Sequence, residues 1–183
     1  MKTRIILQGG FNPGEKQEND PFFHEILNFA PKNAKILLVY FAKEENRIDA
    51  NSREDIEQFE KNKGERNLYL EIATKDAFMR QLAGADIVYL HGGRTEKLLN
   101  ALKEFPGFAD AIRGKIVAGD SAGANVLSSV FYSMSMGIGE GLGILPIKII
   151  CHYKEENKEM LQEIRPELET LLLPEYQIKV YEI

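Results

Sequence analysis

Lys-Ile-Val-Ala-Gly-Asp-Ser-Ala-Gly-Ala-Asn-Val-Leu, residues 115–127, carries most of the information about the fold of this sequence. An apolar, strand-like run passes through Gly-x-Ser-x-Gly into a helix-like run, a succession typical of a nucleophile elbow. In an elbow, Gly119 and Gly123 are small because larger side chains would strike the neighbouring backbone. We therefore expect Ser121 at an exposed strand-to-helix turn, with the backbone N–H of Ala122 as an oxyanion donor. The alternative is a glycine-rich turn that a serine caps.

Short apolar runs and helical spacings alternate on both sides of this stretch. Strands are predicted at residues 4–7, 35–41, 67–72, 85–90, 115–118, 147–151 and 176–181, and helices at residues 22–29, 53–61, 75–82, 96–102, 122–130 and 155–173. The continuous apolarity of residues 36–41 and 86–90 favours strands covered on both faces. The order predicts one α/β domain over residues 1–183, a three-layer sandwich with a mainly parallel central sheet. Its reactive crevice should lie beyond the carboxyl ends of the strands.

The composition excludes several classes of function. The formal net charge is −5 and the basic residues are scattered, so nucleic acid is not an expected partner. Cys151 is the only cysteine, which rules out an internal disulfide and a multi-cysteine metal site. No apolar run approaches the length of a signal-peptide core or a membrane span. We expect a cytoplasmic protein without membrane association, metal or cofactor, and a homodimer stays open.

A second glycine pair closes the buried strand that precedes the elbow. The sequence reads His91-Gly92-Gly93-Arg94-Thr95 before the predicted helix 96–102. Adjacent glycines let backbone N–H groups approach a substrate closely, so Gly92 or Gly93 could supply a second oxyanion donor. The alternative is a tight turn with Thr95 as helix cap. We expect His91, Gly92 and Arg94 to contact the substrate.

A serine hydroxyl needs an adjacent base, normally a histidine. The chain offers His24, His91 and His152. His24 lies in a predicted helix, and His91 abuts the glycine pair. His152 follows the apolar strand 147–151, where the crevice should lie, so we favour His152 as the base.

A carboxylate should orient the histidine. Glu140 lies in a glycine-rich loop, Glu155 on a predicted helix and Glu182 at the end of the last predicted strand. Spacing alone does not rank these three candidates.

Three segments in order resemble the dipeptidase E and cyanophycinase family of serine peptidases: residues 92–99, 119–124 and 141–146, the last leading to His152. The first strand, which ends in Gly9-Gly10, is also similar to the family's start. The resemblance implies a fold like the class I glutamine amidotransferases, with serine in place of their cysteine, and a small peptide substrate. It implies Ser121 as nucleophile, His152 as base, and Gly93 with Ala122 as oxyanion donors.

The resemblance also singles out Glu182 as the triad acid, because residues 180–183 are similar to the segment that carries the family's glutamate. A crossover through the predicted helix 155–173 would return the chain beside the strand it left. The sequence ends one residue after Glu182, where family members continue with further strands. We therefore expect a mobile terminal strand and weak or partner-dependent activity. Residues 153–158 contain no arginine, so a preference for aspartyl substrates is not supported.

Two other functions remain open. A catalytically inactive relative with a binding or regulatory role would fit a shortened terminus. An esterase of the α/β-hydrolase type is disfavoured, because those enzymes have the order serine, acid, histidine, whereas the supported acid follows His152.

Overall fold

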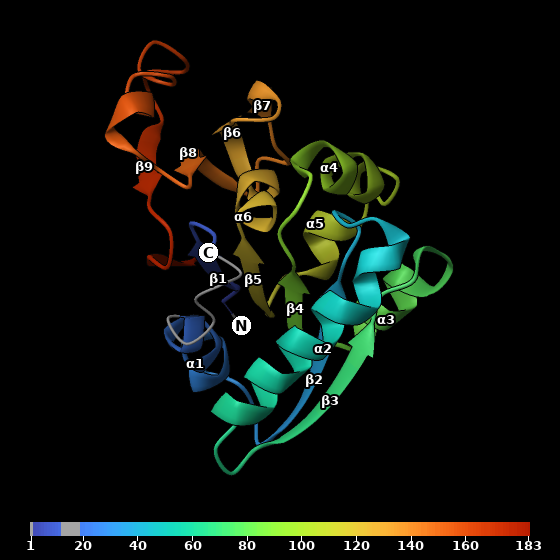
Figure 1. The fold of residues 1–183 in the computed structure, drawn as a ribbon. Helices are drawn as coiled ribbons and strands as arrows, with labels where there is room; N and C mark the ends of the chain where they lie inside the picture. Colours follow the sequence, from blue (N-terminus) through green and yellow to red (C-terminus); the bar gives the residue numbers. More distant parts are fainter. Residues whose placement is uncertain (1, 12–18) are drawn as a thin grey trace.

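The computed structural model describes residues 2–11 and 19–183, which form two β-sheets with helices packed against them (Figure 1). The strands of the larger sheet are β1 (Arg4–Gln8), β2 (Asn33–Val39), β3 (Asn67–Ile72), β4 (Ile87–Leu90), β5 (Ile116–Asp120) and β10 (Ile178–Glu182). Their order in the sheet is β10-β1-β5-β4-β2-β3. All neighbours in this sheet are parallel except β10, which is antiparallel to β1.

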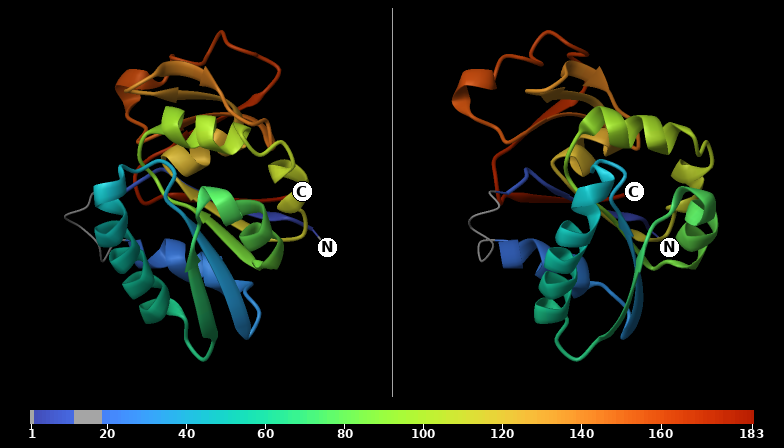
Figure 2. Two further views of the ribbon diagram at one scale, coloured as in Figure 1. Left: turned by 90° about the vertical axis from the view of Figure 1, so that its right-hand side faces the viewer. Right: turned by 45° about the vertical axis from the view of Figure 1, so that its right-hand side comes forward.

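A smaller sheet follows the elbow in the sequence. Its strands are β6 (Ser128–Ser133), β7 (Gly137–Glu140), β8 (Leu145–Cys151) and β9 (Glu169–Leu173), in the spatial order β7-β6-β8-β9. Strands β6, β8 and β9 run parallel to one another, and β7 pairs with β6 as an antiparallel hairpin. Figure 2 shows this sheet, in orange and red, as a separate layer above the larger sheet.

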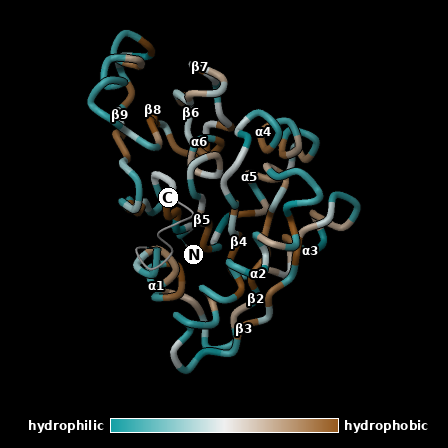
Figure 3. The backbone as a smooth tube through the Cα atoms, in the orientation of Figure 1, coloured by the Kyte–Doolittle hydropathy of each residue, from teal (hydrophilic) through white to brown (hydrophobic). Residues whose placement is uncertain are grey.

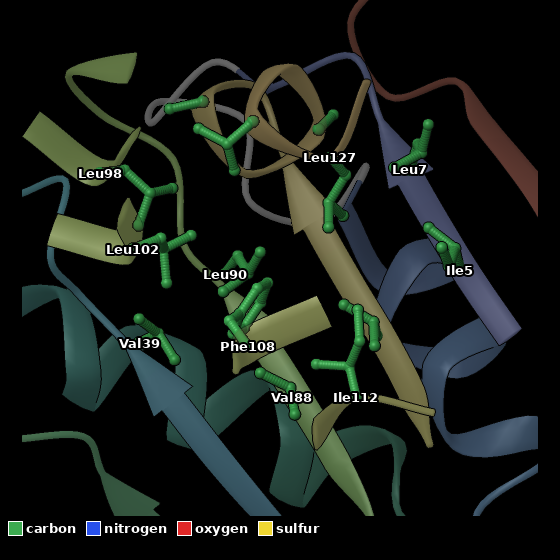
Figure 4. Packing of buried hydrophobic residues seen from close by; sticks show 14 of the residues in the cluster. Ile5, Leu7, Val39, Val88, Leu90, Leu98, Leu102, Phe108, Ile112 and Leu127 are labelled. Atoms are coloured by element: carbon green, nitrogen blue, oxygen red, sulfur yellow. The ribbon is translucent and has the colours of Figure 1, made fainter. Parts of the chain in front are cut away.

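Helices cover both faces of the larger sheet. The helices are α1 (Asp20–Asn28), α2 (Glu45–Asn62), α3 (Phe78–Gly84), α4 (Thr95–Lys103), α5 (Phe108–Ala111) and α6 (Ala122–Leu127), with short 3₁₀ turns at Lys75–Ala77 and Glu155–Asn157. Helices α1 and α2 pack on one face with Ile6, Leu38 and Tyr89. Helices α3 to α6 pack on the other face with Leu7 and Val88 (Figure 4).

Residue alternation along each strand explains this arrangement, because successive side chains point to opposite faces. Neighbouring residues of β4, such as Val88 and Tyr89, therefore belong to different clusters, and both are fully buried. In Figure 3 apolar colour concentrates along the strands of the larger sheet, while much of α2 is hydrophilic. The predicted α/β fold with a mainly parallel sheet is confirmed, and each predicted strand corresponds to a strand of the structure.

The prediction of a helix over residues 155–173 was wrong. The structure has a 3₁₀ turn at Glu155–Asn157, then turns, then β9. Pro166 lies in the middle of this segment, where it lacks an N–H and its ring disfavours helical backbone in the preceding residue. Arg165 has a φ of 46°, which lies outside the right-handed helical region. The predicted helix 122–130 is likewise shorter, because α6 ends at Leu127 and β6 begins at once.

The last strand is paired along its length, whereas the sequence suggests a loosely held terminus. Strand β10 pairs with β1 over its whole length, and the N–H and carbonyl groups of Thr3 and Ile183 bond reciprocally at 2.8 and 3.0 Å. It does not return beside β8; that position belongs to β9. None of the helices within the described residues is long and apolar enough to cross a membrane.

Candidate active site

Ser121 lies at the turn between β5 and α6, in an uncommon backbone conformation with φ 47° and ψ −102°. Positive φ is unfavourable for a residue with a Cβ and persists only where the surroundings enforce it. Here the N–H of Ser121 donates to the carbonyl of Gln8 on the neighbouring β1, at 3.0 Å. The turn therefore presents the hydroxyl at the carboxyl edge of the larger sheet.

Two glycines make the sharp turn sterically feasible. A Cβ on Gly119 would lie 2.5 Å from the carbonyl carbon of Gly123, and a Cβ on Gly123 would lie 2.1 Å from the carbonyl oxygen of Leu90. Both distances are far below van der Waals contact, so α6 can approach β4 and β5 this closely only with glycine at both positions.

Ser121 and His152, expected as partners from the sequence, lie within hydrogen-bond distance. The distance from Ser121 Oγ to His152 Nε2 is 3.0 Å. His152 directly follows β8, and its own backbone φ is 49°. The two residues thus come from different sheets and meet between them.

The carboxylate that reaches His152 belongs to Glu175, with its Oε1 2.9 Å from Nδ1. Strands β8 and β9 are parallel neighbours, and Cys151 pairs with Leu173 at their ends. His152 and Glu175 therefore emerge at the same edge. Because a carboxylate only accepts, Nδ1 donates to Glu175, which leaves Nε2 of the neutral ring free to accept the Ser121 hydroxyl proton.

The end of β1 holds this histidine in place. The N–H of His152 donates to the carbonyl of Gly9 at 2.7 Å, and the N–H of Tyr176 donates to that of Gly10 at 2.8 Å. A Cβ on Gly10, whose φ is 101°, would lie 2.3 Å from His152 Nε2. Gly9-Gly10 is thus a backbone cradle for the His152–Glu175 pair, a role that the sequence analysis did not foresee.

The second glycine pair forms a turn between β4 and α4, residues 91–94, called here the glycine turn. The N–H of His91 donates to Val39 O at 3.1 Å, and that of Arg94 donates to Ala42 O at 3.1 Å. The N–H of Gly92 donates to Asp120 Oδ1 at 2.7 Å.

Only Gly93 of this turn keeps its N–H without an acceptor among the described residues. The N–H of Ala122, first in α6, is equally without an acceptor in this part of the chain. Of the two glycines considered as donors, Gly93 is therefore the one whose N–H is available, while Gly92 donates to Asp120.

A cleft of about 260 Å³ opens over these residues. Its lining is polar and comes from several elements: Phe11, Lys43, Asn51, Glu54, His91, Gly92, Gly93, Asp120, Ser121 and His152. The cleft is large enough for a small peptide segment. Two larger hollows elsewhere on the surface are not lined by Ser121, His152 or Glu175.

The expectation that Glu182 approaches His152 was wrong. Strand β10 is antiparallel to β1, so Glu182 lies opposite Arg4 at the other edge of the sheet, where its carboxylate pairs with Arg4 and Lys2. The open alternatives are not beside His152 either. Glu155 accepts from Tyr153 and Lys158, and Glu140 is exposed on β7.

Arg94 and His91, which the sequence suggests as substrate contacts, are not placed to contact a substrate freely. The side chain of Arg94 is 69% exposed outside the cleft, 3.9 Å from Glu44. His91 lines the cleft, but it is only 3% exposed and both ring nitrogens have partners.

Cys151 lies beside the elbow without the character of a nucleophile. Its Sγ is 3.5 Å from the carbonyl oxygen of Ser121. Burial, together with the charge of Asp120, raises the pKa of the thiol far above its ordinary value. Within residues 2–11 and 19–183, no group of His, Cys, Asp or Glu side chains is arranged to hold a metal ion.

The fold and these contacts define an α/β protein with a serine, a histidine and a glutamate in hydrogen-bonded succession at a nucleophile elbow. Residues 5–179 match peptidase family S51, and the chain belongs to that family. The family consists of serine peptidases related to dipeptidase E. No curated protein matches the sequence.

Two solved structures have the same fold. A protein of Listeria monocytogenes EGD-e assigned as a peptidase E is 19% identical, with a TM-score of 0.70, over 100% of this chain and 98% of that one. A peptidase from an acI-B1 actinobacterium is 20% identical, with a TM-score of 0.69, over 99% of this chain and 84% of that one.

Proposed function

We propose that this member of family S51 hydrolyses a small peptide through an acyl-enzyme on Ser121, with His152 as base and Glu175 as the acid that orients it. The observation that carries the proposal is the continuous contact from Ser121 Oγ to Nε2 and from Nδ1 to Glu175, at 3.0 and 2.9 Å. Nucleophile, base and orienting group in hydrogen-bond succession are the requirement for an activated serine.

In the first step Ser121 Oγ attacks the carbonyl carbon of the scissile bond while His152 Nε2 takes the hydroxyl proton. The carboxylate of Glu175 stabilises the imidazolium that results. The N–H groups of Gly93 and Ala122 stabilise the oxyanion, a contribution of about 10²–10³-fold in rate for one donor in a well-studied serine peptidase.

Collapse of the tetrahedral intermediate breaks the C–N bond, and His152 returns its proton to the departing amine. Water then attacks the acyl ester while His152 Nε2 takes a proton from it, and His152 returns this proton to Ser121 Oγ as the ester C–O bond breaks and the acid product leaves. The polar cleft of about 260 Å³ supports a small substrate. The chain order serine, histidine, glutamate disfavours an esterase of the α/β-hydrolase type.

A fluorophosphonate probe tests the proposal. We expect covalent labelling at Ser121, located by peptide mass mapping, and hydrolysis of dipeptides in a mixture of defined composition. Ser121→Ala is the negative control, and Ser129→Ala, away from the cleft, should label as wild type. No labelling and no hydrolysis would instead favour the inactive, peptide-binding relative.

A further inference from the structure

A buried polar cluster lies under the cleft, and the proposed triad does not use it. Its members are Asp55 on α2, His91 in the glycine turn and Asp120 at the end of β5, each 3% exposed. The hydroxyls of Tyr40 and Tyr89 contact it. Burying two carboxylates is costly unless they are hydrogen-bonded or paired with a positive charge. The cluster therefore calls for an explanation.

The partners of His91 indicate that it is an imidazolium. Nδ1 lies 2.8 Å from Asp55 Oδ2, and Nε2 lies 3.1 Å from Asn51 Oδ1. Asn51 and Asp55 are four residues apart on α2, so one face of that helix presents both oxygens to the ring. A ring that faces an acceptor at each nitrogen satisfies both only when both nitrogens carry hydrogen.

The charges around His91 favour the same state. Burial alone would lower the pKa of His91, but the Asp55 and Asp120 carboxylates outweigh burial and raise it above its ordinary value. The hydroxyl of Tyr89 lies 3.3 Å from His91 Nδ1 and 3.4 Å from Asp120 Oδ1, and so connects the two residues. The groups that face His91 are Asn51 and Asp55 from α2, Tyr40 and Lys43 from the connection after β2, Tyr89 from β4 and Asp120 from β5.

Asp120 connects this cluster to the proposed oxyanion site. Its Oδ1 accepts the N–H of Gly92 at 2.7 Å, a short bond to a charged acceptor. Gly92 precedes Gly93, whose N–H is the available donor. The bond therefore restricts the rotation that aims the Gly93 N–H. Asp120 also precedes Ser121, so one side chain fixes the glycine turn relative to the nucleophile. A Cβ on Gly92 would lie 2.3 Å from Asp120 Oδ2, which shows how closely the turn is held.

We propose that Asp120 is a positioning residue that aims the Gly93 N–H at the oxyanion, and that imidazolium His91, held by Asp55, keeps Asp120 ionised for this task. The inference rests on the proposed function. It adds that the rate depends on a second histidine, His91, besides the base His152. A donor displaced by about 1 Å can cost about 10²-fold in rate, so the cluster should act on kcat.

The variant Asp120→Asn keeps the shape and one acceptor oxygen but removes the charge, and Asp120→Ala removes both. With p-nitrophenyl acetate as the probe, we expect kcat to fall about tenfold in the first and about a hundredfold in the second, with KM within about twofold. Asp86→Asn is the matched control, because Asp86 Oδ2 accepts the N–H of Lys35 at 2.9 Å at the other end of the sheet. Its kcat should equal that of wild type.

Thermal unfolding separates positioning from a purely structural role. Burial raises the pKa of Asp120 above its ordinary value despite the charge of His91 and the bond from Gly92. A raised pKa favours the folded protein below the unfolded-state pKa, and this contribution is lost as pH rises through the folded-state pKa. Ionised Asp120 thus reduces stability at higher pH, so Asp120→Asn should lose kcat without a lower unfolding midpoint. If Asp120 had only a structural role, its substitution by asparagine would lower both kcat and the unfolding midpoint.

His91→Gln provides a second variant. In wild type, kcat should fall as pH rises through the raised pKa of His91, because the neutral ring loses one of its two N–H donors and the positive charge that offsets the ionised Asp55 and Asp120. In His91→Gln this alkaline fall should disappear, and kcat at neutral pH should be about tenfold lower.

The outcomes distinguish this inference from the proposed function. A wild-type protein that is neither labelled by fluorophosphonate nor active on the ester overturns the proposed function, and the inference with it. A wild-type protein that is active, with unchanged kcat in both Asp120 variants, overturns the inference alone. An alkaline fall that persists in His91→Gln overturns the part assigned to His91.

Discussion

The two halves of the proposed site differ in how they are held. Ser121 and the glycine turn follow β5 and β4, whose residues are buried, and backbone bonds fix both segments. His152 and Glu175 follow β8 and β9 of the smaller sheet, and their side chains are 37% and 45% exposed. The nucleophile half is thus positioned by a packed core. The base half depends on the backbone cradle of Gly9-Gly10. An added Cβ in the first half should therefore affect stability as well as rate, whereas an added Cβ in the second half should affect rate more than stability.

The largest effect should come from removing a group that belongs to the chemistry in either half. We expect Ser121→Ala and His152→Ala each to lower kcat by about 10⁵–10⁶-fold, and the double variant to be no worse, because nucleophile and base act as a unit. Ser121→Ala should change the free energy of unfolding by no more than about 1 kcal/mol. Additive losses, measured by single-turnover kinetics, would contradict the pairing.

Glu175→Gln tests the acid. The amide keeps the shape but no longer stabilises the imidazolium, so kcat should fall by about 10³–10⁴-fold, by analogy with other triads. The comparison is with Glu182→Gln under the same conditions. A fast Glu175→Gln enzyme beside a slow Glu182→Gln enzyme would restore the assignment made from the sequence.

Two glycine substitutions test the contrast between the halves. In Gly10→Ala the new Cβ would lie 2.3 Å from the His152 ring, so kcat should fall about 10–100-fold, and the φ of 101° adds a loss of stability that is smaller than in Gly123→Ala. In Gly123→Ala the new Cβ would lie 2.1 Å from Leu90 O between packed elements, which should cost about 1–3 kcal/mol of stability. Urea titration of both variants measures their free energies of unfolding. An equal loss of stability in the two would remove the distinction.

Glu182→Gln should have the smallest effect. Hydrogen bonds from Arg4 and Lys2 lower the pKa of Glu182 below its ordinary value. A lowered pKa contributes stability above the unfolded-state pKa, and the contribution is lost as pH falls through the folded-state pKa. The unfolding midpoints of variant and wild type should therefore differ slightly at neutral pH and converge in acid, with kcat unchanged.

The larger sheet and the elbow could be predicted from the sequence because local signals are strong there. Continuous apolar runs such as residues 87–90 are typical of buried parallel strands. The Gly-x-Ser-x-Gly segment indicates both the sharp turn and the nucleophile within five adjacent residues. The sequence predicts Ser121, His152, Gly93 and Ala122 as site residues, and the structure brings Ser121 and His152 within hydrogen-bond distance.

The proposed acid, Glu175, could not be predicted, because the prediction for its segment was wrong. The helical spacing of residues 155–173 predicts one helix, although Pro166 interrupts it. A signal was present in Leu171-Leu172-Leu173-Pro174-Glu175: three consecutive apolar residues before a proline read better as a strand and its end than as a helical turn. The ranking of Glu182 also assumed that the last strand returns beside β8. Which edge a terminal strand joins depends on long-range pairing, which local sequence does not encode.

The reciprocal bonds between Thr3 and Ile183 have a consequence for the connectivity of the molecule. Because the two ends of the chain lie side by side, a short linker could join them, and the polypeptide could be opened instead at the turn of residues 134–136, where Met134 is 84% exposed. Such a circular permutant would read histidine, glutamate, serine along the chain and keep the residues of every strand pairing, with only the β6–β7 turn cut. The order of the three residues in the sequence would then reflect the evolutionary origin of the chain. The geometry of the site would not depend on that order.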